Sequence, residues 1–322
     1  MDYRRVYVKD LLASEPGGRA EAYGWIKTRR DSKGLSFVQL SDGSTFKDLQ
    51  VILEAGAIPE EARKALTTGA CVRFSGELVA SPAPGQAVEL KADAVEVYGE
   101  ADPATYPLQK KGATMEYLRE IAHLRTRGNT FGAVFRVRAA LAQAVHRFFA
   151  DRGFHYIHTP IITASDAEGA GAMFAVSTML QPGEDHQPKL AKGGYETDFF
   201  GKPAFLTVSG QREAETMALG LTNVYTFGPT FRAENSSTSR HLAEFWMIEP
   251  EMAFCSLEGD MNLAEEFLKE TIGAALTECA EDLEFFDKRI EPGLLGTLNH
   301  VVASGFERMT YTEAVRILEN SG

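Results

Sequence analysis

Cysteine is scarce, and the sequence has no long apolar run. The three cysteines, Cys71, Cys255 and Cys279, form no CxxC or cysteine–histidine spacing, which argues against a disulfide framework or a zinc site. The sequence contains no run of about 18 apolar residues, the length that a transmembrane helix requires. The first residues are not followed by the apolar segment of a signal peptide. We therefore expect a cytoplasmic protein with no membrane partner.

Basic residues are also in deficit. The chain has 33 Lys and Arg against 45 Asp and Glu, a formal charge of −12. Non-specific binding to DNA depends on a surplus of cations, so no DNA partner is expected. The overall charge does not exclude a local surface that binds nucleic acid. With 44% hydrophobic residues over 322 positions the chain can bury a core, and its length suggests about two domains at ~150 residues each.

The first hundred residues have the pattern of short strands separated by turns. Apolar residues alternate along several segments, and clusters such as Ser41-Asp42-Gly43-Ser44 interrupt them. Five short strands with one short helix fit a small OB-fold barrel, a fold that often binds single-stranded nucleic acid. The predicted strands cover 21–26, 35–40, 49–54, 71–78 and 87–97, with a basic hairpin segment at 27–33 and a helix near 59–66.

A second domain follows a non-periodic, Pro- and Lys-containing stretch that we interpret as a hinge at 102–129. An amphipathic helix is predicted at 130–151, closed by Gly153, and buried strands are predicted at 204–208, 224–227 and 245–248. A polar surface loop is expected at 181–194. The fold class is therefore α+β, with a barrel at 1–101 and a mainly antiparallel sheet within 130–322. The apolar face of the helix comprises Val134, Val137, Leu141, Val145, Phe148 and Phe149.

The most informative stretch is a predicted hairpin around the polar loop 235–239. If a strand continues through Arg232 and Glu234, their spacing of two places both on one face. The planar guanidinium of Arg232 suits a phosphate oxygen. The same pair also occurs on solvated hairpins where the charges pair with neighbours. Spacing alone leaves both interpretations open.

The string TFGPTFRAENSSTSRHLAEFWMIEPE resembles the motif 2 hairpin of class II aminoacyl-tRNA synthetases, and in detail the asparaginyl-tRNA synthetase family. Other segments agree in order along nearly the whole chain. Gly24-Trp25-Ile26 and the strands after it resemble the family's anticodon-binding OB domain. The segment 154–160 resembles motif 1, which builds the dimer interface, and SDAEGAGAMF at 165–174 resembles the loop that covers the substrate.

The resemblance implies an ATP site. Arg232 would hold the α-phosphate and act as the catalytic residue, and Glu234 would meet the adenine amino group or the tRNA end. Arg240 and His241 would face the γ-phosphate, and Phe245 would stack on adenine. Without the resemblance, Phe245 would be read as core and His241 as a surface residue.

The segment VSGQREAE at 208–215 bears on the choice of amino acid. If a helix starts at Gln211, then Gln211, Ala214 and Glu215 share a face. The resemblance implies that Glu215 accepts a hydrogen bond from the side-chain amide of asparagine. It also implies that Gln211 and Glu168 contact the α-amino group of the substrate. The related aspartyl enzymes carry a Lys at the position of Ala214. Two carboxylates about 4 Å apart at an effective dielectric near 20 repel by ~4 kcal/mol, about a thousandfold, which disfavours aspartate. Glu215 could also simply lie at a solvated helix start.

As a whole, the resemblance implies ATP-dependent attachment of L-asparagine to tRNA(Asn) through an asparaginyl-adenylate, by a homodimer. ATP and Mg²⁺ would be the cofactors, with Arg232 and Mg²⁺ neutralising charge at the α-phosphorus. A basic pair, Arg29-Arg30, could equally be a solvated hairpin tip. The residues expected to bind the anticodon are Trp25, Lys27, Arg29, Phe37 and Gln39.

The sequence departs from the family in one respect. Motif 3, with its second ATP-binding Arg, and the late acidic residues that hold Mg²⁺ are not found, so no metal ligand is assigned here. We expect an incomplete catalytic domain, an amino-terminal portion that activates asparagine poorly in isolation. Two alternatives stay open: a truncated or paralogous module that binds tRNA or dimerises without catalysis, and an aspartyl-specific ligase, which Ala214 disfavours.

Overall fold

The computed structural model describes residues 5–83, 85–108, 112–165, 172–182, 188–190, 193–235, 238 and 240–321. Its contacts divide the chain into two units, Met1–Ala142 with Ile272–Gly305, and Gln143–Thr271 with Phe306–Gly322. The domain boundaries expected at 101 and 129 stay predictions. Within the described ranges, no helix is long and apolar enough to cross a bilayer.

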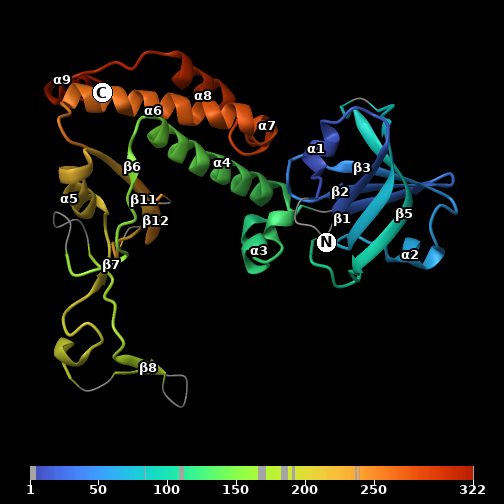
Figure 1. Ribbon diagram of the computed structural model, residues 1–322, viewed down its shortest axis with the longest axis horizontal. Coiled ribbons are helices and arrows are strands. Elements are labelled where there is room, and N and C mark those ends of the chain that lie inside the picture. Colours follow the sequence, from blue (N-terminus) through green and yellow to red (C-terminus); the bar gives the residue numbers. More distant parts are fainter. Residues whose placement is uncertain are drawn as a thin grey trace. The chain divides into compact units, whose positions relative to one another are not determined.

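The first unit contains the predicted five-stranded barrel. The strands β1 (Arg19–Ser32), β2 (Leu35–Ser41), β3 (Leu49–Glu54), β4 (Cys71–Ala80) and β5 (Val88–Gly99) close in the order β1-β2-β3-β5-β4 (Figure 1). Alternate side chains fill the interior, which confirms the OB fold. The helices α1 (Val8–Leu12) and α2 (Glu60–Ala65) complete it. Fully buried side chains of the interior include Ile26, Val38, Leu40, Leu49, Val51, Leu53, Val72, Phe74 and Leu90.

The segment expected to be a basic hairpin at 27–33 is mostly strand. β1 continues to Ser32, and the turn is confined to Lys33 and Gly34, both with positive φ (42° and 83°). A bulge interrupts the pairing of β1 with β2: Ile26 faces Leu40 and Thr28 faces Gln39, so Lys27 is the extra residue.

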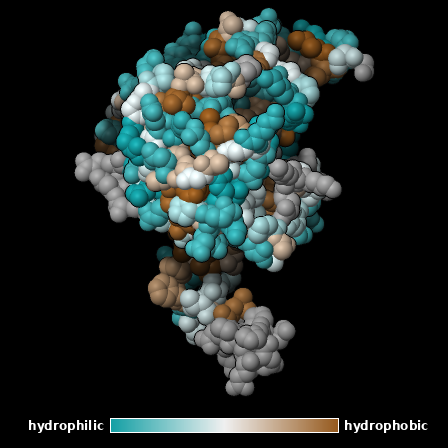
Figure 2. Space-filling view, turned by 90° about the vertical axis from the view of Figure 1, so that its right-hand side faces the viewer, coloured by the Kyte–Doolittle hydropathy of each residue, from teal (hydrophilic) through white to brown (hydrophobic). Residues whose placement is uncertain are grey.

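The outer surface of the barrel is polar. Figure 2, which views the molecule from the side of the barrel, shows a largely hydrophilic face with smaller hydrophobic areas among the polar side chains. Scattered apolar side chains of this kind are normal on a folded surface. No broad apolar patch therefore marks this view.

Helices complete the first unit. They are α3 (Met115–Glu120), the 3₁₀ turn η1 (Arg125–Arg127), the first part of α4 (Asn129–Asp151), the end of α6 (Leu257–Glu278), α7 (Ala280–Arg289) and α8 (Leu294–Ala303). α4 confirms the helix predicted at 130–151, but Val134, assigned to its buried face, is 40% exposed, while Phe131 and Ala133 are buried instead. α3 lies in the predicted hinge, where no helix was expected.

The second unit is built on a three-stranded sheet. β11 (Asn223–Phe231) pairs antiparallel with β12 (Glu244–Met252) and parallel with the short β6 (His155–Tyr156). One face packs on α4 and α6 through an aromatic cluster that includes Phe149, Tyr225 and Phe267, with Phe149 stacked 4.4 Å from Tyr225. The strands predicted near 224–227 and 245–248 are thus confirmed.

Shorter elements make up the rest of the second unit. α5 (Gln211–Leu221) begins at the predicted residue, and α9 (Tyr311–Glu319) begins after a capping box at Thr310. The described part of the predicted loop 181–194 includes a hairpin instead, β8 (Leu180–Pro182) with β9 (Pro188–Leu190). The remaining elements are β7 (Ile162–Thr163), β10 (Phe205–Leu206) and η2 (Tyr195–Thr197).

Candidate active site

The sheet of the second unit has one face that does not carry the aromatic cluster. Phe245, Met247, Glu249 and Glu251 alternate along β12, so they share this face, and all four are half-buried. Opposite Met247 stands Gly228, where a Cβ would meet nothing within 4 Å. The face therefore carries an aromatic ring, a thioether and two carboxylates, and the space above Gly228 is unoccupied by other described side chains.

Arg232 is the first residue after β11. Its amide donates to the Ala243 carbonyl (3.0 Å), which extends the pairing of the hairpin by one step. The guanidinium lies 5.4 Å from the centre of the Phe245 ring, and Nη2 lies 4.0 Å from Met247 Sδ. Its Nε is buried and has no hydrogen-bond partner among the described residues. A buried cationic donor without a partner is costly, and an anion such as a phosphate oxygen would satisfy it.

Glu249 is a site residue that the sequence reasoning missed. Its carboxylate accepts from the Gly210 amide (3.1 Å), from Thr226 Oγ1 (2.9 Å) and from Ser209 Oγ. Ser209 and Gly210 immediately precede α5, so Glu249 ties the start of that helix to the sheet. A Cβ on Gly210 would lie 2.7 Å from Thr159 Oγ1, which is why only glycine fits there. The period of two from Phe245 could have indicated Glu249.

The start of α5 carries the residues predicted to choose the amino acid. Gln211 Nε2 donates to Glu215 Oε1 (3.0 Å), so the structure brings these two side chains together. Ala214 is fully buried beside them and supplies no cation. Glu168, predicted for the α-amino group, lies outside the described residues.

Carboxylates from three elements converge near the end of β12. Burial raises the pKa of Glu251, and Glu215, Glu249 and Asp260 raise it further. The negative charge of one of these groups therefore disfavours ionisation of its neighbour. The local field favours a cation or a neutral donor over an anion.

The other predicted ATP-site residues lie in the connection between β11 and β12. Because β11 ends at Phe231, strand alternation does not place Arg232 and Glu234 on one face, and Glu234 and Arg240 are exposed. His241 is also exposed, and its Nδ1 contacts Thr238 Oγ1. The structure does not gather these three around Arg232, and their assigned roles stay predictions.

On the barrel, several predicted anticodon residues share the outer surface. Thr28 Oγ1 donates to Gln39 Oε1 (2.6 Å), and the Arg30 guanidinium lies 5.2 Å from the centre of the Phe37 ring. The ring of Trp25 lies under the guanidinium of Arg127, 4.7 Å away. These contacts leave Phe37 and Gln39 adjacent on the polar side of β2.

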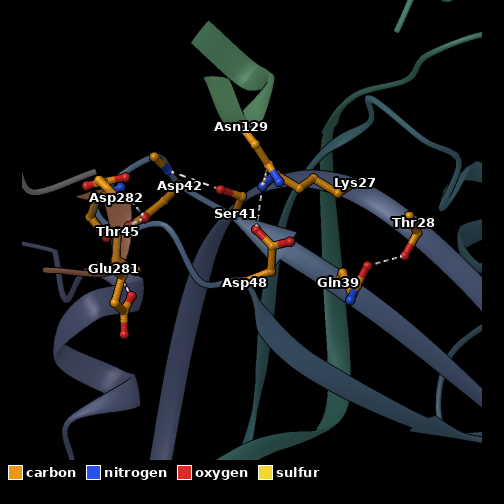
Figure 3. A network of polar contacts seen from close by, with 12 residues as sticks. Lys27, Thr28, Gln39, Ser41, Asp42, Thr45, Asp48, Asn129, Glu281 and Asp282 are labelled. Carbon is orange, nitrogen blue, oxygen red and sulfur yellow. Dashed lines mark hydrogen bonds and ion pairs between the residues drawn. The ribbon is translucent and has the colours of Figure 1, made fainter. Parts of the chain in front are cut away.

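The two predicted cations of β1 are engaged elsewhere. Lys27 Nζ bridges Asp48 (2.8 Å) and Asn129 Oδ1 (3.0 Å), as Figure 3 shows. Arg29 pairs with Asp31 (3.0 Å) and donates to the Arg63 carbonyl. Both are half-buried, so neither presents a free charge on the outer face.

In the part of the chain that the structure describes, no group of three or more His, Cys, Asp or Glu side chains is arranged to hold a metal ion. The acidic residues near Glu251 therefore do not define a metal site by themselves.

Comparison with known proteins gives two family matches. Residues 114–322 match tRNA synthetases class II (D, K and N), and residues 22–98 match an OB-fold nucleic acid binding domain. An asparagine–tRNA ligase of Solibacter usitatus is 58% identical over 316 residues, covering 98% of this chain and 67% of that protein. One from Syntrophobacter fumaroxidans is 58% identical over 321 residues, covering 98% and 68%.

A solved structure agrees. The asparaginyl-tRNA synthetase of Pyrococcus horikoshii, complexed with asparaginyl-adenylate, superposes with a TM-score of 0.81 at 26% identity, covering 100% of this chain and 68% of that one. The chain thus spans about two thirds of the length of the proteins it matches.

Proposed function

Since the chain belongs to the asparagine–tRNA ligases, within the class II tRNA synthetases, we propose that it attaches L-asparagine to tRNA(Asn) at the expense of ATP. Activation forms an asparaginyl-adenylate and releases pyrophosphate. Transfer to the 3′-terminal adenosine of the tRNA then releases AMP.

Arg232 carries this proposal. The asparagine carboxylate is already a nucleophile, so activation requires alignment and charge neutralisation at the α-phosphorus rather than a general base. The buried Nε of Arg232, which lacks a partner among the described residues, is a donor suited to a phosphate oxygen. Phe245, on the same sheet face, offers a ring on which adenine can stack.

The amino-acid pocket follows from the start of α5. With Ala214 in place of a cation, no described group at this position attracts a side-chain carboxylate, whereas Glu215 accepts from a carboxamide NH₂. The carboxylates of Glu249 and Glu251 attract the α-ammonium group and repel a second carboxylate. Asparagine is therefore favoured over aspartate.

Transfer requires the tRNA to be held by both of its ends. We assign the anticodon to the outer surface of the barrel, where Trp25, Phe37 and Gln39 provide stacking and hydrogen bonding. The dimer implied by the motif 1 resemblance would use the segment around β6, where Tyr156 is 46% exposed. Gel filtration tests the dimer directly.

Mg²⁺ would accompany the ATP phosphates and neutralise their charge. The described residues form no cluster of three or more ligands for it, so they do not define a magnesium site. The roles above depend only on side chains of this chain.

Binding of a non-hydrolysable asparaginyl-adenylate analogue, measured by calorimetry, tests the proposal without requiring turnover. The aspartyl analogue is the matched control, and asparagine-dependent pyrophosphate exchange is the second measurement. We expect preferential binding of the asparaginyl analogue. Equal or tighter binding of the aspartyl analogue would indicate an aspartyl ligase, and binding of neither would contradict the activation site.

A further inference from the structure

Arg127, from the turn η1, stands on the ring of Trp25 although the two residues are about a hundred positions apart in sequence. Its guanidinium carbon lies 4.7 Å from the ring centre, and Nη1 donates to Tyr106 Oη (3.2 Å) and, at 3.4 Å, to the Gly69 carbonyl. These neutral acceptors and the aromatic face hold the guanidinium in place. No carboxylate in the described part of the chain forms an ion pair with it.

The charge of Arg127 is notable in a chain of formal charge −12. Arg125, in the same 3₁₀ turn, is also held by aromatic rings, those of Phe131 (5.1 Å) and Phe135 (5.5 Å). The turn therefore carries positive charge that the described acidic residues do not neutralise. Of the two, only Arg127 lies over Trp25, and an unneutralised arginine beside an aromatic ring is a combination that proteins use to bind single-stranded RNA.

Two cavities adjoin the Trp25–Arg127 pair. The larger, about 860 Å³, is lined by both residues together with Lys27, Thr28 and Gln39. The smaller, about 380 Å³, is lined by both residues with Cys71 and Tyr106. These volumes fall in the range of small-molecule sites, about 300–1,000 Å³. The larger cavity unites an aromatic ring, a planar cation and the Thr28–Gln39 hydrogen-bonding pair.

We propose that Arg127 is a further tRNA-contacting residue, which with Trp25 walls a pocket for an unstacked base of the anticodon loop and meets the adjoining phosphate. The proposal rests on the proposed function and extends the anticodon surface from the barrel strands to the segment that follows them. Because the guanidinium already covers one face of the Trp25 ring, Arg127 offers its other planar face to a base, Thr28 and Gln39 offer polar atoms to the edge of the base, and the guanidinium charge attracts the adjoining phosphate.

The chain offers a direct reporter, because Trp25 and Trp246 are its only tryptophans. In a Trp246→Phe background, Trp25 fluorescence is followed while an anticodon stem–loop RNA of tRNA(Asn) is added at several salt concentrations. A stem–loop of the same length with a different loop sequence is the control RNA. The compared variants are Arg127→Met, Arg127→Lys and Arg125→Met, the last removing an equal charge from the same turn.

We expect Arg127→Met to weaken binding of the cognate stem–loop about tenfold, to reduce the quenching of Trp25, and to lower the salt dependence by about one phosphate contact. Arg127→Lys restores the salt dependence but not the full quenching, because lysine keeps the charge and loses the planar face. Arg125→Met stays within about twofold of the parent. Thermal melting of each variant separates loss of binding from loss of folding.

Unchanged binding by Arg127→Met, or an equal loss in Arg125→Met, would overturn the proposal while leaving the ligase function intact. If the parent itself does not distinguish the cognate stem–loop from the control, the anticodon assignment of the barrel fails with it. Selective binding of the adenylate analogue would still show that the activation site is independent of this failure.

Discussion

The guanidinium of Arg232 lies 5.4 Å from the centre of the Phe245 ring, at the loop end of the hairpin formed by β11 and β12. Thr230 pairs with Phe245 near the end of the regular β11–β12 pairing, so the sheet holds the backbone of Phe245 in place. The hydrogen bond from the Arg232 amide to the Ala243 carbonyl holds the backbone that carries the guanidinium. A nucleotide in this corner would meet a ring and a charge whose separation is already set.

Replacing Arg232 by Met removes the charge and keeps an apolar side chain against Phe245. We expect about 10- to 100-fold weaker binding of the asparaginyl-adenylate analogue, since a charge-assisted hydrogen bond contributes ~1.5–3 kcal/mol. Calorimetry measures the loss, and Arg316→Met on the exposed α9 is the control. Parent-like affinity in the Arg232 variant would remove the phosphate assignment.

Glu249→Gln tests the anchoring of α5. The carboxylate serves three donors, and an amide keeps only one acceptor oxygen, so we expect the free energy of unfolding of the second unit to fall by about 1–3 kcal/mol. Hydrogen exchange at the Gly210 amide should accelerate in parallel. Glu244→Gln, at the exposed first residue of the same strand, should change neither quantity, and equal effects in the two variants would refute the anchoring role.

Ala214→Lys tests the choice of amino acid. We expect loss of binding of the asparaginyl analogue, because a cation then stands beside Glu215 and competes for it. Ala214 is fully buried, so added volume alone costs ~1–3 kcal/mol. Ala214→Met, of similar length without charge, measures that part. If the Lys variant binds the asparaginyl analogue as well as the Met variant does, the side-chain assignment is wrong.

The raised pKa of Glu251 predicts a pH-dependent penalty. Because the folded-state pKa of Glu251 lies above the ordinary value of 4.5, ionisation of this carboxyl group lowers the free energy of unfolding. The loss is absent well below pH 4.5, grows as the pH rises from 4.5 toward the folded-state pKa, and is complete above it. Glu251→Gln should therefore raise the melting temperature at pH 7.5 but not at pH 4. Glu319→Gln on exposed α9 is the control, and a pH-independent difference would contradict the titration.

Arg136 of α4 pairs with Asp282 of α7 through Nη2 (2.7 Å) and Nε (3.1 Å), and Nη1 donates to the Gly43 carbonyl (3.1 Å). Asp282 is buried, so Arg136→Leu should cost ~3–5 kcal/mol by leaving its charge unpaired. Urea unfolding of the first unit measures this. Lys288→Met, which breaks the exposed Lys288–Glu284 pair, should cost only ~0.3–0.5 kcal/mol. If Arg136→Leu lowered the free energy of unfolding as little as Lys288→Met does, the buried pair would not stabilise the first unit.

Local patterns in the sequence predicted the barrel and α4, because alternation and helical spacing depend on neighbours within a few residues. α3 was missed since six residues with a single buried side chain, Leu118, leave no periodicity. The partners of Glu249 come from residues 209, 210 and 226, and the ring beneath Arg127 comes from residue 25. Contacts of this range depend on chain topology, which no local pattern specifies.

The same limit applied to the bulge at Lys27, whose position is decided by the partner strand. Ala22, Gly24 and Ile26 turn inward before it, whereas Thr28 and Arg30 turn outward after it. A single inserted residue thus inverts the phase of the strand halfway along its length. If β1 and β2 paired regularly through Lys27, then Thr28 and Arg30 would face the apolar interior. Excising Lys27 instead makes the Ile26–Leu40 and Thr28–Gln39 pairs consecutive and keeps both side chains outward, so a one-codon deletion here should preserve the register and remove mainly the Lys27–Asp48 ion pair.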